Sequence, residues 1–354
     1  SRGLGDVYKR QAPLAASVAC TSNPEWRDAC PSIPSRPETV MPVRLQWEPP
    51  SRDTWETLFD TIPRSNLLQS WAYGEAKQRA QRTSIRRGIV WHEARPIALI
   101  QTLEYSFGPL CVVRCNRGPL WLGTVDDALR NDTYAALRCS ARWWRGRALL
   151  IAPELDDKRP LTPALERLGY RRRGAARWRS AWIDLSATPD HLRASLDRRW
   201  RNHLHQAERS GIVVQVDAEQ SSFEWLMERY RTLIAERRFS GIDIELLANL
   251  RQAQRKSDDM LVVYATRGMD RVAGMLTVRH GAAATYVVGW TGDEGRKLNA
   301  QHLVLWTALR ELKARGCGAF DVGGIDAHAT PGIASFKRGL KGSEYNLVGE
   351  FFAL

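Results

Sequence analysis

Residues 320–351 read FDVGGIDAHATPGIASFKRGLKGSEYNLVGEF and contain a strand, a glycine turn, a short helix and a second strand. The apolar run that ends at Asp321 predicts a buried strand, and Gly323 and Gly324 let the chain bend sharply after it. The segment IASFKRGL predicts a short helix, and EYNLVGEFF has the apolar pattern of a last strand. This order of elements is typical of a mixed α/β fold.

The elements before this stretch follow one order twice along the chain. In each half, helices are followed by an alternating hairpin, a further strand, a helix and a buried strand. The matching pairs are RPIALIQTLEY (95–105) with RVAGMLTVRHG (271–281), RALLIAPEL (147–155) with GAFDVGGID (318–326), and LTPALERLGY (161–170) with PGIASFKRGL (331–340). We predict two tandem α/β units, over residues 41–185 and 186–354, each a mostly antiparallel sheet with helices around it. Chance similarity between two stretches of mixed α/β sequence is the alternative.

Residues 1–40 differ from the rest of the chain because they show no periodic pattern of apolar residues. The stretch SRGLGDVYKRQ has none, and the apolar core of APLAASVAC is too short for a signal peptide. Patterned sequence begins after Met41. We expect residues 1–40 to be a non-native or disordered leader and Met41 to be the natural start.

Charge is the most informative bulk property. The 354 residues include 52 Lys and Arg against 39 Asp and Glu, which gives a formal net charge of +13. This surplus favours polyanionic partners such as nucleic acid, a nucleotide-linked substrate or an anionic membrane surface, although an arginine-rich proteome would also produce it. The six cysteines form no framework, and no metal site is predicted. No apolar run approaches the roughly 18–20 residues of a membrane span, so we expect a reduced, cytoplasmic protein.

Four further segments are distinctive in their order along the chain. They are LLQSWAYGEAK (67–77), DRRWRNHLHQAERSGIVV (197–214), NAQHLVLWTALRELKARGCGAFDVGGID (299–326) and PGIASFKRGLKGSEYNLVGEF (331–351). Together they resemble the FemA/FemB-type aminoacyltransferases of peptidoglycan cross-bridge synthesis, which contain two GNAT-like acyltransferase units. The resemblance covers Asn66 to Phe351. In two departures, no long coiled-coil arm follows the basic helix, and DEGRKLNAQH (293–302) lacks the glycine spacing of a loop that holds the pyrophosphate of coenzyme A.

The resemblance implies transfer of an aminoacyl group from aminoacyl-tRNA to an amine of a peptidoglycan precursor, either a UDP-linked or a lipid-linked muropeptide. The lipid-linked form would bring the basic surface to the inner membrane face. Because the donor ester is already activated, the protein needs no cofactor and no covalent intermediate. It must orient the amine and the ester and stabilise the oxyanion. Acyl transfer from a coenzyme A thioester and a non-catalytic protein that binds anionic surfaces are the alternatives.

Lys337 is the first candidate for catalysis. Placed just beyond the bend at Gly323 and Gly324, it would face the oxyanion, and a solvated surface lysine is the alternative. Phe336 would pack beside it and help to shape the acyl pocket. Asp321 ends a strand, where ligands of α/β sheets often bind, and would either orient the attacking amine or cap the turn. The two glycines would also let substrate approach the backbone closely.

Two helices supply candidate substrate ligands. On SWAYGEAK (70–77), Trp71 and Glu75 share a face, so we expect Lys77 to lie to one side and to be available to solvent. According to the resemblance, Trp71 and Lys77 belong to the segment that binds the precursor, with Lys77 at its diphosphate. An ordinary surface lysine is the alternative.

A second, basic helix is predicted over residues 190–211. Its apolar residues recur at spacings of three and four and form a core stripe; they are Leu192, Leu196, Trp200, Leu204 and Ala207. Arg198, Arg199 and Arg201 project elsewhere and would bind phosphate oxygens of the precursor or of tRNA, unless they form only a solvated face. On the strand AAATYVVGW (282–290), Tyr286 lines the acceptor channel according to the resemblance, whereas core packing is the commoner role of such a tyrosine.

Overall fold

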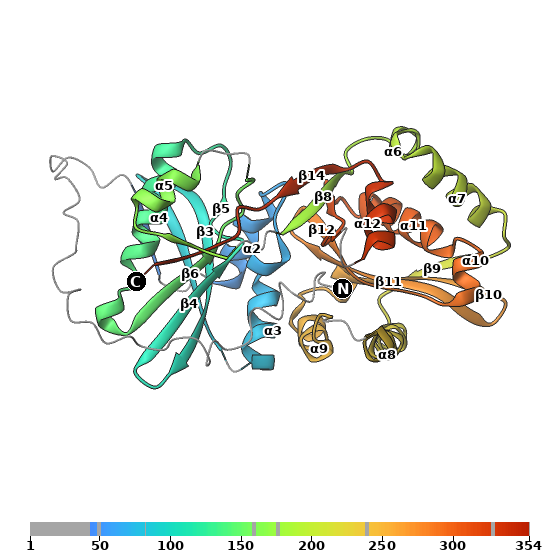
Figure 1. Cartoon of the computed structure of the whole chain (residues 1–354), viewed down its shortest axis with the longest axis horizontal. Helices are drawn as coiled ribbons and strands as arrows, with labels where there is room; N and C mark the ends of the chain where they lie inside the picture. The colour runs from blue at the N-terminus through green and yellow to red at the C-terminus, as the bar shows by residue number, and fades with distance from the viewer. Residues whose placement is uncertain are drawn as a thin grey trace.

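The fold comes from a computed structural model, which describes residues 43–47, 51–81, 83–157, 161–174, 178–237, 241–326 and 330–353. Two α/β units lie side by side, each built on one mixed sheet (Figure 1). The predicted leader, residues 1–40, lies outside the described residues.

The first sheet has the strand order β1-β2-β3-β4-β6-β15-β7, with β5 paired to β3. Its strands are β1 (Arg44–Gln46), β2 (Ser84–His92), β3 (Arg95–Phe107), β4 (Leu110–Asn116), β5 (Leu120–Trp121), β6 (Arg147–Ala152), β7 (Arg171–Arg173) and β15 (Glu350–Ala353). On one face pack α4 (Asp127–Cys139) and α5 (Leu161–Arg167), and on the other packs α2 (Arg52–Asp60). The sheet is therefore covered on both sides.

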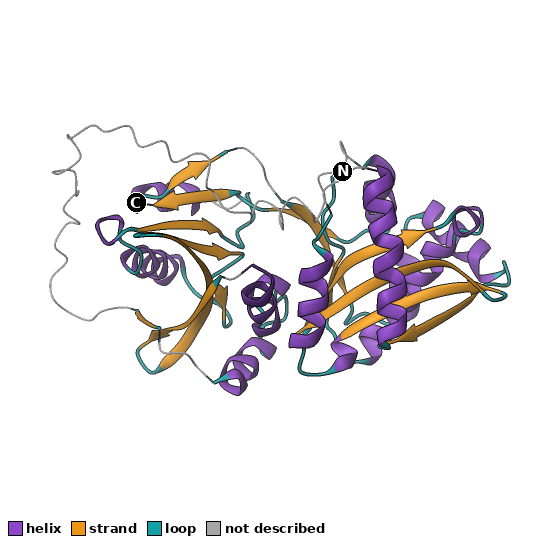
Figure 2. Cartoon of the chain, turned by 90° about the horizontal axis from the view of Figure 1, so that it is seen from below, coloured by secondary structure: helices purple, strands orange, loops and turns teal. Residues whose placement is uncertain are grey.

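The second sheet has the strand order β14-β8-β13-β12-β11-β10-β9. Its strands are β8 (Arg179–Asp184), β9 (Val213–Asp217), β10 (Met260–Arg267), β11 (Asp270–His280), β12 (Ala283–Thr291), β13 (Ala319–Asp321) and β14 (Ser343–Asn346). Helices cover both of its faces (Figure 2). One face carries α8 (Gln220–Arg237) and α9 (Ile244–Ala253), and the other α6 (Pro189–Ser195), α7 (Arg198–Glu208), α11 (Ala300–Ala314) and α12 (Pro331–Arg338). No helix in the described ranges has the length and apolar character needed to cross a bilayer.

The two sheets repeat one topology. Three antiparallel strands, β2-β3-β4 or β10-β11-β12, are followed by a helix and then by a strand parallel to the third, β6 or β13. Every other strand pair in the described residues is antiparallel. The predicted fold class, two tandem and mostly antiparallel α/β units, is confirmed.

The halves of the chain exchange one strand each. β8 lies within the predicted first unit, 41–185, yet it pairs with β13 and β14 of the second sheet. β15 lies within the predicted second unit, 186–354, yet it pairs with β6 and β7 of the first sheet. A boundary at residue 185 therefore does not separate the two sheets, because each sheet needs a strand from the other half of the chain.

The predicted helix over 190–211 is wrong as a single element. It divides into α6 and α7 because Leu196 is extended, with φ −58° and ψ 150°, and the Asp197 carboxylate then accepts the N–H of Arg199 at 2.9 Å as an N-cap. The apolar stripe nevertheless survives the break. All five of its residues are buried in the second unit.

The interface between the units is formed largely by α3 (Trp71–Gln81) and α9. Tyr73 and Ala76 of α3 are fully buried and belong to the same apolar cluster as Leu247 and Leu250 of α9. The first unit thus contributes a helix to the core of the second, which holds the two units together.

Candidate active site

β12 and β13 run parallel but pair over only three residues each, from Ala283 opposite Ala319 to Thr285 opposite Asp321. β13 ends there, whereas β12 continues to Thr291. Ligands of α/β sheets commonly bind beyond the carboxyl end of a strand at such a change of pairing. The described residues around this point include Tyr286, the Gly323–Gly324 turn and α12.

Lys337, on α12, is buried at this point and is only 4% exposed. Its Nζ donates a hydrogen bond of 2.8 Å to the carbonyl of Gly324 and lies 4.9 Å from the centroid of the Tyr286 ring. Burial lowers the pKa of Lys337 to about 8, although the charge of Asp321 opposes the shift. The alternative of a solvated surface lysine is therefore wrong, and the ammonium is held in one place beside the end of β13.

The helix that carries Lys337 is fixed by α7. Trp200 donates its indole N–H to the carbonyl of Phe336 at 3.1 Å, and the two rings lie 6.0 Å apart. Gly339 follows α12, where a Cβ atom would approach Trp200 to 2.5 Å, so only glycine lets the two helices pack this closely. Phe336 therefore packs between α7 and α12. Its contribution to the site is indirect, because it helps to fix the position of its neighbour Lys337.

Asp321 is 1% exposed and its carboxylate is surrounded by donors. The N–H of Gly323 donates to Oδ1 at 2.9 Å, the hydroxyl of Tyr345 donates to Oδ2 at 2.7 Å, and Ser180 also hydrogen-bonds the carboxylate. Gly323 has φ +71°, the left-handed conformation that glycine adopts without strain. Of the two roles that the sequence left open for Asp321, the geometry favours the one of capping the turn.

Sequence reasoning missed a buried ion pair that joins this turn to the first unit. Arg117 follows β4 and pairs with the carboxylate of Glu154 through two of its nitrogens. Its guanidinium also donates a hydrogen bond of 2.8 Å to the hydroxyl of Tyr345 and lies 3.5 Å from the carboxylate of Asp321. Burial alone would lower the pKa of Arg117. The neighbouring acidic groups have the larger effect and keep this pKa well above its usual range. The rule that singled out Asp321, a charged residue at the end of a buried strand, would also have found Glu154 beyond β6.

The expectation that Lys77 is available to solvent is wrong. Lys77 is fully buried, because α9 of the other unit packs against α3. Its ammonium has no hydrogen-bond partner among the described residues, and burial, together with the charge of Arg114, lowers the pKa of Lys77 to about 7. Arg114 is itself 5% exposed and pairs with Glu350. Two buried cations thus lie near one another at the interface.

The remaining candidates make contacts of their own. The guanidinium of Arg87 lies 3.5 Å from the centroid of the Trp71 ring, so Trp71 packs in the first unit. Arg201 donates to the carbonyls of Ala194 and Leu196 at 2.6 and 2.5 Å, which ties α7 to the end of α6. Arg198 and Arg199 are exposed on α7. Among the described residues, the structure therefore links Lys337, Phe336, Asp321, Tyr286, Gly323 and Gly324 to one another, and the contacts found for Trp71 and Arg201 are with other residues.

Comparison with known proteins agrees with this fold. Residues 191–338 match the acetyltransferase (GNAT) domain family. The structure of FemX is similar with a TM-score of 0.74, at 16% identity over 87% of this chain and 97% of that one. A tandem GNAT protein from the clavulanic acid biosynthesis pathway is similar with a TM-score of 0.51, at 12% identity over 88% of this chain and 98% of that one. The C-terminal domain of a putative lysylphosphatidylglycerol synthetase from Agrobacterium fabrum reaches 0.50, at 13% identity over 85% and 92%.

A search of curated proteins finds no match. The predicted resemblance to FemA/FemB-type proteins is confirmed in the fold, through FemX, and the matched domain contains Tyr286, Asp321 and Lys337. Residues 191–338 thus match the acetyltransferase (GNAT) domain, and the chain shares the two-unit fold of FemX.

Proposed function

We propose that the chain transfers an aminoacyl group from aminoacyl-tRNA to an amine of a peptidoglycan precursor. The observation that carries the proposal is the buried ammonium of Lys337, fixed by the carbonyl of Gly324 and the ring of Tyr286 where β13 ends. A fixed cation in a water-poor site stabilises an oxyanion that forms beside it, because the charge needs no reorganisation during the reaction.

The proposed step is a direct acyl transfer. The amine attacks the ester carbonyl, a C–N bond forms, and the oxyanion of the tetrahedral intermediate faces Lys337. The C–O bond to the ribose of tRNA then breaks, the ribose oxygen takes up a proton, and the amine loses one. The protein's contribution is to hold the two substrates together and to stabilise the charge.

The ionisation of the buried thiols and imidazoles agrees with a direct transfer. Burial raises the pKa of Cys317, four residues before Asp321, to about 11, so its thiol stays protonated at neutral pH. Burial lowers the pKa of His280 to about 3, and both of its ring nitrogens are hydrogen-bonded, to Ser65 at 3.1 Å and to Thr285 at 2.7 Å. Neither side chain is prepared to act as a nucleophile or to activate one.

The proposed acceptor carries a diphosphate, and Lys77 with Arg114 would hold it. A buried ammonium without a hydrogen-bond partner is costly, and an anion placed beside it would relieve that cost. Because α9 covers Lys77, the proposal requires α3 and α9 to separate locally when the acceptor binds. A nucleotide-linked and a lipid-linked muropeptide share this diphosphate chemistry.

We expect Lys77→Met to have opposite effects on stability and on binding. Without ligand, the free energy of unfolding of the variant should be higher by about 1–3 kcal/mol. Met has a length similar to that of Lys but removes the unpartnered buried ammonium. The KM for a UDP-linked muropeptide should rise at least about tenfold, because the diphosphate loses a cation. Thermal unfolding and steady-state kinetics measure the two effects. If KM stays at the wild-type value, Lys77 is only a buried lysine and has no part in acceptor binding.

The donor is tested by offering aminoacyl-tRNA and acetyl coenzyme A in parallel with muropeptide acceptors and measuring the product masses. Coenzyme A is the second candidate because the matched family consists of acetyltransferases. Transfer from aminoacyl-tRNA alone supports the proposal, and transfer from acetyl coenzyme A alone overturns the donor assignment.

Salt dependence distinguishes a tRNA site from a coenzyme A site. Binding of tRNA should weaken steeply with salt, with a slope of about −0.7 to −0.9 in log K against log salt concentration for each phosphate that the protein neutralises. Replacing the exposed Arg198 and Arg199 by Gln should make the slope shallower by about one for each arginine that binds a phosphate. Arg231→Gln, an exposed arginine on α8, is the control that should leave the slope unchanged. An unchanged slope in the α7 variants would remove that helix from the tRNA site.

A further inference from the structure

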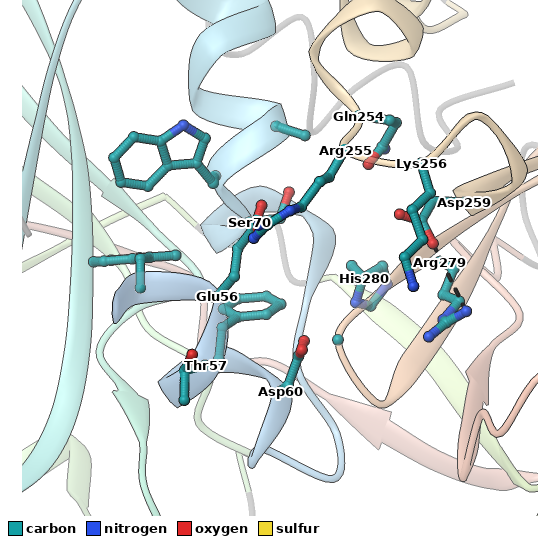
Figure 3. A pocket seen from close by; sticks show the side chains of 15 residues that line it. Glu56, Thr57, Asp60, Ser70, Gln254, Arg255, Lys256, Asp259, Arg279 and His280 are labelled. Atoms are coloured by element: carbon teal, nitrogen blue, oxygen red, sulfur yellow. Dashed lines mark hydrogen bonds and ion pairs between the residues drawn. The ribbon is translucent and has the colours of Figure 1, made fainter. Parts of the chain in front are cut away.

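A cavity of about 410 Å³ lies between the two units (Figure 3). The first unit contributes α2 and the start of α3, including Asp60 and Ser70. The second unit contributes the segment after α9, with Lys256, and the end of β11, with Arg279 and His280. Its volume is within the range of small-molecule sites. None of the residues grouped around Lys337 lines it.

The first unit gives the cavity only acidic groups, and the second unit gives it three cations and one acid, Asp259. Asp60 extends from α2, and the cations Arg255, Lys256 and Arg279 belong to the other unit (Figure 3). Burial and the neighbouring Glu56 raise the pKa of Asp60, and the three cations oppose this shift, so they are within electrostatic range. Among the described residues, none of these cations forms an ion pair with Asp60. The Glu56–Arg255 ion pair links the two walls, whereas Asp60 is left without an ion pair.

Most of the other polar groups on the walls are already satisfied within the protein. Glu56 pairs with Arg52 at 2.7 Å and with Arg255 at 2.9 Å, and both ring nitrogens of His280 are hydrogen-bonded. Arg279 makes only a loose contact of 3.8 Å with Asp259. The charges left for a ligand are thus the Asp60 carboxylate on one side, and on the other Lys256 and Arg279, whose charge Asp259 offsets in part.

The first unit also supplies an aromatic wall to the cavity. Trp55 of α2 is fully buried and lines the cavity, and its indole N–H has no acceptor among the described residues. An aromatic wall beside separated charges is suited to a compact polar molecule.

We propose that this cavity binds a small zwitterion of the short-peptide class, with its ammonium on Asp60 and its carboxylate on Lys256 and Arg279. A simple anion or a simple cation would match one wall and leave the other charge uncompensated, whereas a zwitterion matches both. The site does not depend on the acyl donor or acceptor assigned to Lys337.

The probe is triglycine, which carries both charges and no side chains. Its controls are N-acetyl-triglycine, which lacks the ammonium, and triglycine amide, which lacks the carboxylate. We expect triglycine to bind the full chain in titration calorimetry and each blocked peptide to bind at least about tenfold more weakly, because each lacks one ionic contact. Equal binding of the three peptides, or no binding of triglycine, would overturn the proposal.

Two substitutions locate the contacts. Asp60→Asn should reduce triglycine affinity at least about tenfold and abolish the difference between triglycine and its N-acetyl form. Lys256→Gln should reduce the difference between triglycine and its amide. Asp190→Asn, an exposed carboxylate on α6, is the matched control and should change neither comparison. Thermal unfolding confirms that each variant is folded. If Asp60→Asn binds triglycine as the wild type does, the assignment of the ammonium to this cavity is wrong.

Discussion

Lys337→Met is expected to lower kcat about 10²–10³-fold, the loss that follows removal of one oxyanion donor in characterised acyl-transfer sites. Met keeps the length of the side chain but removes the charge that Gly324 and Tyr286 hold in place. The thermal midpoint should not fall, because the change removes a buried charge. Arg338→Met, the next residue on the helix and partly exposed in a pair with Glu344, is the control and should keep most of the activity.

The pH profile gives a separate measure of the same group. Burial lowers the pKa of Lys337 to about 8, and the charged form is the one proposed to act. Transfer by the wild type should therefore decline as the pH rises through about 8, where the ammonium loses its proton. The residual activity of Lys337→Met should lack this decline. A variant that keeps both the wild-type rate and the alkaline decline would exclude Lys337 from catalysis.

Arg117→Met is expected to cost about 3–5 kcal/mol of unfolding free energy, because it leaves buried carboxylates without their cation. Glu154 would lose an ion pair, and Asp321 a neighbour at 3.5 Å. Burial already raises the pKa of Glu154 against the attraction of Arg117, and in the variant burial and the charge of Asp321 would remain without that attraction. Because a group with a raised folded-state pKa favours the folded state at low pH, the cost of the variant should shrink as the pH falls. Urea unfolding at several pH values measures it.

A double-mutant cycle separates the ion pair from general packing. Arg117→Met with Glu154→Gln should be clearly less destabilised than the sum of the two single changes, because the pair is lost together. Arg147→Met, which breaks a more exposed pair with Glu104 in the same sheet, should cost no more than about 1 kcal/mol. Additive effects of the two buried changes would show that Arg117 and Glu154 do not act as a pair.

The order of elements could be predicted from the sequence because most strands here are coded by neighbouring residues. The hairpin β10-β11 and the helix–strand succession α11-β13 follow local patterns of apolar residues and glycine stops. The strand exchange could not be read in this way. β15 is a short apolar segment whose pattern fits either sheet, and its partner is selected by packing between residues about 200 positions apart.

The site residues illustrate the same limit. Lys337 can be found because a glycine bend and a strand end lie close to it in sequence. The prediction that Lys77 is available to solvent is wrong because helix geometry gives only the direction of a side chain. The burial of Lys77 depends on α9 of the other unit. The break at Leu196 is missed because Asp197 can act as an N-cap only once the preceding turn is extended. Arg117 and Glu154 would have been found if the rule that singled out Asp321, a charged residue at the end of a buried strand, had been applied to the first half of the chain as well.

The exchanged strands also constrain how the chain can fold during synthesis. In the described structure β7 pairs only with β15, so the edge of the first sheet beyond β6 stays unfinished until residues 350–353 have left the ribosome. Domains usually fold in order as they emerge. Here the unit that is made first must wait for a strand made about 200 residues later, and the exposed edge of β6 needs protection from neighbouring chains throughout that interval.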